Sequence, residues 1–143
     1  MFKINKLNDT TDEKVVINSS KQEVYKVGNG VIDYNLLLDF DITGKIGNDT
    51  YSFGFDLSCK PSDFLDNDVL DYKKDNLHIG ETYFNFNDEN GVEPSELNIK
   101  FTRYVKNKFI VYIEFVTDDY YSSVIEFTFD IDDYLIDLEG GSK

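Results

Sequence analysis

A chain of 143 residues with 41% hydrophobic and 15% aromatic residues holds enough apolar material for one folded core, so its many charges do not indicate disorder. Its 28 acidic and 14 basic residues give a formal net charge of -14, which disfavours nucleic acid and anionic membrane as partners and favours a basic protein. The excess is uneven: residues 1–60 carry 7 Lys and 9 acids, a net of -2, while residues 61–143 carry 7 basic and 19 acidic residues, a net of -12.

The first half of the chain shows strand periodicity. Residues 13–18 and 23–27 can form edge strands. Apolar residues then alternate with mostly polar ones from Ile32 to Ile42 and again from Tyr51 to Leu57, with turn-forming residues at 44–49 between the two runs. This period of two predicts a long antiparallel hairpin over residues 31–58 with one apolar face.

The alternation stops at residues 61–75. Pro61 and Ser62 can open a helix, with Ser62 as N-cap and Asp63 in the first turn, and the apolar residues that follow have roughly helical spacing. We therefore expect one short helix near residues 62–74 that covers one end or face of a sheet.

Strands resume after this helix. Alternation predicts strands over residues 78–86, 97–105, 109–117 and 122–131, joined by short turns. The 109–117 strand is largely apolar on both faces, so we expect it to be central or covered on both sides. Arg103 falls at an inward-pointing position, where a buried guanidinium needs a carboxylate partner, and a structural ion pair is expected there rather than a ligand contact.

Together these elements predict a mainly β fold, an antiparallel β-meander of about six to eight strands that forms a sandwich or a half-open barrel with one inserted helix. Residues 1–138 are expected to form a single domain and residues 139–143 a flexible tail. The chain has no signal-like apolar start and no run of about 18 apolar residues, so we expect a cytoplasmic location. The absence of Ala and the abundance of Lys, Asn and Ile are typical of an AT-rich bacterial or phage genome.

The chain lacks the parts of most enzyme sites. Cys59 could act as a nucleophile only if His78, the one histidine, approached it, and one Cys with one His cannot build a typical zinc site. The acidic stretches 66–71 and 85–91 depart from the EF-hand loop, and the absence of Trp disfavours a glycosidase. We expect no enzyme activity, no cofactor and no bound metal.

Two acidic segments are the candidate binding surface. Five aspartates crowd residues 61–75, and eight acids with no base lie between Asp118 and Glu139, interleaved with tyrosines of the kind found at interface hot spots. The predicted partner-binding residues are Asp66, Asp68, Asp71, Asp118, Asp119, Tyr120, Tyr121, Asp130, Asp132, Asp133 and Tyr134. The alternative is that the acids only keep an aromatic-rich β protein soluble and protect its edges.

With these Asp-rich segments at 61–75 and 118–139, the small acidic β-rich chain resembles immunity proteins of bacterial toxin–immunity systems, including contact-dependent inhibition. The resemblance is a global profile without a diagnostic motif. It implies a protein that neutralises a basic partner, such as a nuclease toxin or another nucleic-acid-binding protein, by covering its active site. Two alternatives stay open: an assembly subunit of a phage or secretion system, forming a homo-oligomer through Ile110, Tyr112 and Val116, and a β-barrel that binds a small hydrophobic or sugar ligand.

Overall fold

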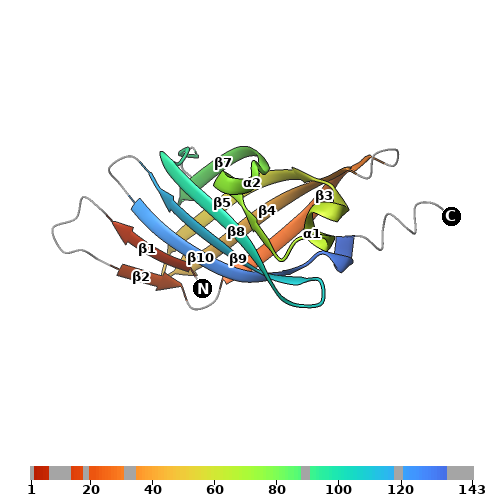
Figure 1. Cartoon of the computed structure of the whole chain (residues 1–143). Coiled ribbons are helices and arrows are strands. Elements are labelled where there is room, and N and C mark those ends of the chain that lie inside the picture. The colour runs from red at the N-terminus through yellow and green to blue at the C-terminus, as the bar shows by residue number, and fades with distance from the viewer. Residues whose placement is uncertain are drawn as a thin grey trace.

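The computed structural model describes residues 2–6, 14–17, 20–30, 35–87, 91–117 and 121–134. It shows a β-sandwich of two antiparallel sheets (Figure 1), with strand orders β2-β1-β10-β9-β8-β6 and β3-β4-β5-β7. The element bounds are β1 (Phe2–Lys6), β2 (Lys14–Ile17), β3 (Ser20–Gly30), β4 (Asn35–Ile46), β5 (Asp49–Cys59), α1 (Pro61–Leu65), β6 (Val69–Asp71), α2 (Tyr72–Asp75), β7 (His78–Phe86), β8 (Glu96–Val105), β9 (Lys108–Val116) and β10 (Tyr121–Asp130).

The mainly β, antiparallel class predicted from the sequence is confirmed. The described residues form ten strands, more than the expected six to eight, because the short strands β1 and β6 were not predicted. Strand β9 is central, as expected, since it pairs with β10 on one side and β8 on the other. Two runs of neighbouring strands, β3-β4-β5 and β8-β9-β10, follow chain order and account for most of the predicted meander.

The β4–β5 hairpin is the longest predicted element and is confirmed. Its strands pair without a shift from Leu36 opposite Cys59 to Ile46 opposite Asp49. The reversal is tighter than the sequence suggested, because Gly47 adopts a positive φ of 59° that closes the hairpin over two residues. Alternate side chains of both strands are buried against the opposite sheet.

Phenylalanine rings from the two sheets interdigitate to form the core. Phe40 of β4 stacks on Phe55 at 4.5 Å between ring centroids and contacts Phe129 of the opposite sheet at 5.4 Å. Phe53 stacks on Phe115 across the sandwich, also at 4.5 Å. Such pairs add about 0.5–1.5 kcal/mol each beyond the burial of their area. Rings of the two sheets therefore pack directly against one another in the interior of the sandwich.

Residues 60–77, here called the crossover segment, leave the four-stranded sheet after β5 and return to it at β7. Between these strands, β6 pairs with β8 at the edge of the six-stranded sheet. The segment thus ties the two sheets together. Phe64 of α1 is fully buried and meets Phe101, Phe109 and Phe129 at 5.1–5.5 Å, so it closes one end of the core.

The helical structure predicted near residues 62–74 is present, but it is divided into two short helices that flank strand β6. Asp71 separates them: its carboxylate accepts the backbone N–H groups of Lys73 and Lys74, which starts α2 as a new helix. The N-cap of α1 is Lys60 and not Ser62, since Pro61 already takes the first helical position. Asp63 supports this start by accepting the Lys60 N–H at 2.8 Å.

Candidate acidic interface and crossover pocket

Arg103 brings the two predicted acidic segments to one end of the sandwich. Its Nε lies 3.1 Å from Asp68 Oδ1, and this salt bridge confirms the expected structural ion pair. Its Nη1 donates to Asn107 Oδ1 at 2.9 Å, and the Asn107 amide in turn donates to Asp132 Oδ1 at 2.9 Å. A chain of hydrogen bonds therefore links Asp68 of the first segment to Asp132 of the second.

The same guanidinium also holds the backbone of α1 and the residues after it. Arg103 Nη2 donates to the carbonyl oxygens of Phe64, Leu65 and Asn67, and Nη1 donates to that of Lys106. The guanidinium carbon lies 4.8 Å from the centroid of the Phe109 ring, a cation–π contact. Arg103 thus acts as a structural anchor of the crossover segment.

Most of the predicted interface residues that the structure describes have local structural roles. Asp71 caps α2, and Asp130 accepts the Asp132 N–H at 3.0 Å. Tyr134 stacks on Phe129 at 5.3 Å, and its hydroxyl donates to the carbonyl of Val24 at 3.4 Å.

The remaining predicted residues divide into two groups. The side chains of Asp66 and Asp133 are exposed and take part in none of these contacts. Tyr121 lies at the start of β10, but its side chain is outside the described part of the structure. Asp118, Asp119 and Tyr120 fall outside the described residues altogether.

The structure reveals an acidic surface that the sequence did not predict, on the outer side of the four-stranded sheet. Strand register sets Glu23 opposite Asp41 and Asp39 opposite Asp56, while Glu81 of β7 interacts with Asp56. These five residues, here called the carboxylate face, come from four different strands.

Two acids of the carboxylate face, Asp41 and Asp56, have raised pKa values. A hydrogen bond with Asp39, partial burial and the charges of Asp39 and Glu81 raise the pKa of Asp56 to about 6. Burial, followed by the charges of Glu23 and Asp39, raises the pKa of Asp41. The charged forms of Asp41 and Asp56 are therefore disfavoured in the folded chain, which is an energetic cost of placing them here.

Tyr83 of β7 covers the middle of the carboxylate face. It pairs with Gly54 of β5, and a Cβ on that glycine would lie 2.6 Å from the phenol Cζ and hydroxyl oxygen. Burial and four neighbouring carboxylates raise the pKa of the Tyr83 phenol. The side chain is still 39% exposed, so a large amphipathic ring lies among the acids.

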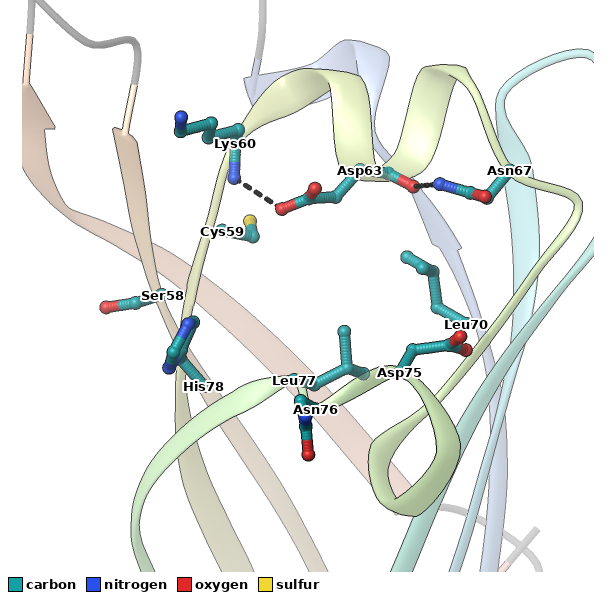
Figure 2. Close-up of a pocket in the computed structure, with 10 residues that line it drawn as sticks. All are labelled: Ser58, Cys59, Lys60, Asp63, Asn67, Leu70, Asp75, Asn76, Leu77 and His78. Carbon is teal, nitrogen blue, oxygen red and sulfur yellow. Dashed lines mark hydrogen bonds between the residues drawn. The ribbon is translucent and has the colours of Figure 1, made fainter.

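A pocket of about 660 Å³ lies under the crossover segment (Figure 2). Its lining residues come from the end of β5, the α1 region, β6, the α2 region and the start of β7: Ser58, Cys59, Lys60, Asp63, Asn67, Leu70, Asp75, Asn76, Leu77 and His78. The structure thus brings Cys59 and His78 to the same pocket. Burial, followed by the charge of Asp63, raises the pKa of the Cys59 thiol to about 12, so the thiol stays protonated at neutral pH and is a poor nucleophile.

Within the described ranges, no group of three His, Cys, Asp or Glu side chains is placed to hold a metal ion. The helices of these same ranges are all too short to cross a membrane. Comparison with protein families, with curated proteins and with solved structures gives no match.

Proposed function

We propose that this protein is a non-enzymatic acidic binding protein that neutralises a basic protein partner, and that the carboxylate face is its main contact surface. An immunity protein that blocks a bacterial toxin domain in the cytoplasm is the form of this function that the sequence profile favours. The proposal carries forward the basic partner expected from the net charge of -14 and moves the contact surface to residues that only the fold brings together.

The clustering of like charges is the observation that carries the proposal. Acids that serve solubility alone can be scattered over the surface, where each keeps its ordinary pKa. On the carboxylate face Asp39 instead lies directly opposite Asp56 on the neighbouring strand, and the pKa of Asp56 rises to about 6. Lys and Arg side chains of a partner would relieve the repulsion between these carboxylates, and this relief would contribute to the free energy of binding.

Tyr83 supplies the second property of an interface. Tyrosine is enriched at binding hot spots because it buries a large area and also offers a hydroxyl. Here the exposed part of the ring stands among Asp39, Asp41 and Asp56, the three acids that raise its pKa together with Glu81. An aromatic centre within an anionic surface is suited to a partner that presents both apolar and cationic groups.

The test begins with capture of a basic protein from the source organism and continues with the purified pair. In one variant, Asp39, Asp41 and Asp56 are all changed to Asn; the matched control changes Asp130, Asp132 and Asp133 to Asn, which removes the same formal charge from the other candidate surface. We expect the first variant to slow association and weaken binding by about tenfold or more, with a smaller effect in the control. Equal effects would indicate general attraction instead of a defined face, and no effect of either variant would contradict the proposal.

A homo-oligomeric assembly subunit remains the second candidate. On the outer side of the six-stranded sheet, Ile110, Tyr112 and Val116 of β9 are only half-buried, and Val69 and Tyr104 are exposed by 44% and 50%. Apolar side chains on an uncovered sheet face favour self-association. A molar mass by light scattering that stays that of one chain at every protein concentration would count against this candidate. A stable oligomer that Tyr112→Glu disrupts would favour it.

A further inference from the structure

We propose that the pocket under the crossover segment binds the side chain of an Arg or Lys residue, with its cationic group between Asp63 and Asp75 and its aliphatic stem on the apolar wall. This inference rests on the proposed function, because the basic partner would supply that side chain. Its direct test below uses the protein alone and therefore does not depend on the partner.

The charged groups of the pocket favour a cation. Asp63 Oδ2 accepts the Lys60 N–H at 2.8 Å, and Asp75 Oδ2 accepts the Asp71 N–H at 2.7 Å. These bonds fix both carboxylates in position, and each acid keeps further acceptor capacity because a carboxylate has about four lone-pair sites. Figure 2 shows the ammonium end of Lys60 directed away from the pocket, so the one lysine of the lining does not neutralise its interior.

The opposite property, an apolar wall, suits the stem of the same ligand. Leu70 is 5% exposed, and Leu77 packs against the hydrophobic core. In Figure 2 these two side chains point toward the centre of the pocket from different sides, with the Cys59 sulfur facing the same space. Because burial keeps that thiol protonated, it adds no charge to the wall. Arg and Lys combine a cationic head with a methylene stem that packs on apolar surface.

The frame of the pocket is held in place before any ligand arrives. The Asn67 amide donates to the Asp63 carbonyl at 2.9 Å, and Arg103 binds the carbonyls of Phe64, Leu65 and Asn67. Asn76 closes α2 in the left-handed conformation with a φ of 51°. A fixed frame lowers the entropy that binding must overcome. A volume of about 660 Å³ lies within the common range of ligand pockets, about 300–1,000 Å³, and leaves room for one long side chain and its backbone.

The pocket also adjoins the carboxylate face. Asp56 and Ser58 lie two residues apart on β5 and so point to the same side of the sheet, about 7 Å apart along the strand. Ser58 pairs with His78 of β7, and both belong to the pocket lining. A partner seated on the carboxylate face would therefore reach the pocket with a neighbouring side chain.

The test is an amide NMR titration of the protein with N-acetyl-L-arginine methylamide, with the corresponding citrulline compound as the uncharged isostere. We expect the arginine probe to shift the amide signals of Asn67, Leu70, Asn76, Leu77 and His78, and the citrulline probe to shift them far less. Asp75→Asn keeps an oxygen for the Asp71 N–H and should weaken arginine binding by about five- to tenfold, the scale of one charge-assisted hydrogen bond. Asp63→Asn provides a second variant should the first disturb the fold.

Asp66→Asn is the matched control, because it removes the same charge from the crossover segment outside the pocket lining. An equal loss of affinity in Asp66→Asn and Asp75→Asn, equal binding of citrulline and arginine, or the absence of shifts at pocket residues would overturn the inference. If the pocket binds arginine selectively but no basic protein is found to bind the chain, the pocket assignment stands and the proposed function is refuted. Binding of a basic partner with unchanged affinity in Asp75→Asn and Asp63→Asn would remove the pocket from the interface.

Discussion

Replacing Arg103 with Met should destabilise the protein by several kcal/mol, because this one guanidinium anchors the crossover segment. Methionine keeps an unbranched stem of similar bulk and removes every hydrogen bond of the guanidinium. Two of the lost bonds, to Asn107 Oδ1 and to the Phe64 carbonyl, are partly buried, and each orphaned acceptor costs about 1–3 kcal/mol. The lost cation–π contact with Phe109 adds about 0.5–1 kcal/mol. Water can replace the bonds at more exposed carbonyls, so we expect a total of about 3–4 kcal/mol.

Asp68→Asn is the control for this prediction. The Asp68 side chain is 89% exposed, so its salt bridge with Arg103 should contribute less than about 1 kcal/mol. Urea denaturation followed by circular dichroism measures both variants, and hydrogen exchange at the amide of Asp66, which bonds to the Ser62 carbonyl, reports on the crossover segment alone. A loss below about 1 kcal/mol in Arg103→Met, or a loss equal to that of Asp68→Asn, would refute the anchoring role.

Three further predictions concern single groups. The pKa of Asp56 is about 6 in the folded chain against an ordinary 3.8, so its protonated form stabilises the fold fully below pH 3.8, and this contribution is lost as the pH rises through 6. Asp56→Asn should therefore be more stable than the native chain at pH 7 by about 1 kcal/mol after allowance for exposure, and the difference should vanish near pH 4. A stability difference that does not change with pH in urea melts would contradict this. The Cys59 thiol, with a pKa of about 12, should react with iodoacetamide at pH 8 only when urea unfolds the chain, and alkylation at the rate of a free thiol in the native state would show this to be wrong. Gly54→Ala should displace the Tyr83 ring, cost about 1 kcal/mol and lower the phenol pKa toward its ordinary value of 10.0, whereas an unchanged ultraviolet titration would contradict the close contact.

The alternation of apolar residues predicted most of the strands because one face of each is buried. The β4–β5 hairpin is the clearest case, since Phe40 and Phe55 lie on the buried faces of its two strands. Strand β6 has three residues, which are too few to show a period of two in the sequence. Its position depends on pairing with β8, which lies far along the chain. The division of the predicted helix into two was not visible for the same reason, because Leu70 reaches the core from a strand and Asp71 then starts a second helix.

The carboxylate face was missed because it depends on strand register and not on local composition. Its acids are dispersed along the sequence from Glu23 to Glu81, and residues 1–60, which supply four of the five, carry a net charge of only -2. Asp39 and Asp41 already stood on the polar face of a predicted strand, which was the one available signal. Nothing local to Asp56 indicates that it pairs with Asp39, since that contact follows from the hairpin register.

The position of the acids separates two explanations of the same net charge. Around Arg103, Asp68 and Asp132 are joined by hydrogen bonds that the fold itself uses, so their negative charge is accounted for by structure. On the carboxylate face, Asp39 and Asp56 lie opposite each other on paired strands, and the interaction with Asp39 raises the pKa of Asp56. A structural role therefore explains much of the predicted acidic surface, whereas the raised pKa values of Asp41 and Asp56 mark an energetic cost on the carboxylate face. The proposed binding of a cationic surface would give these acids a role, and the adjoining pocket would hold one side chain of that surface.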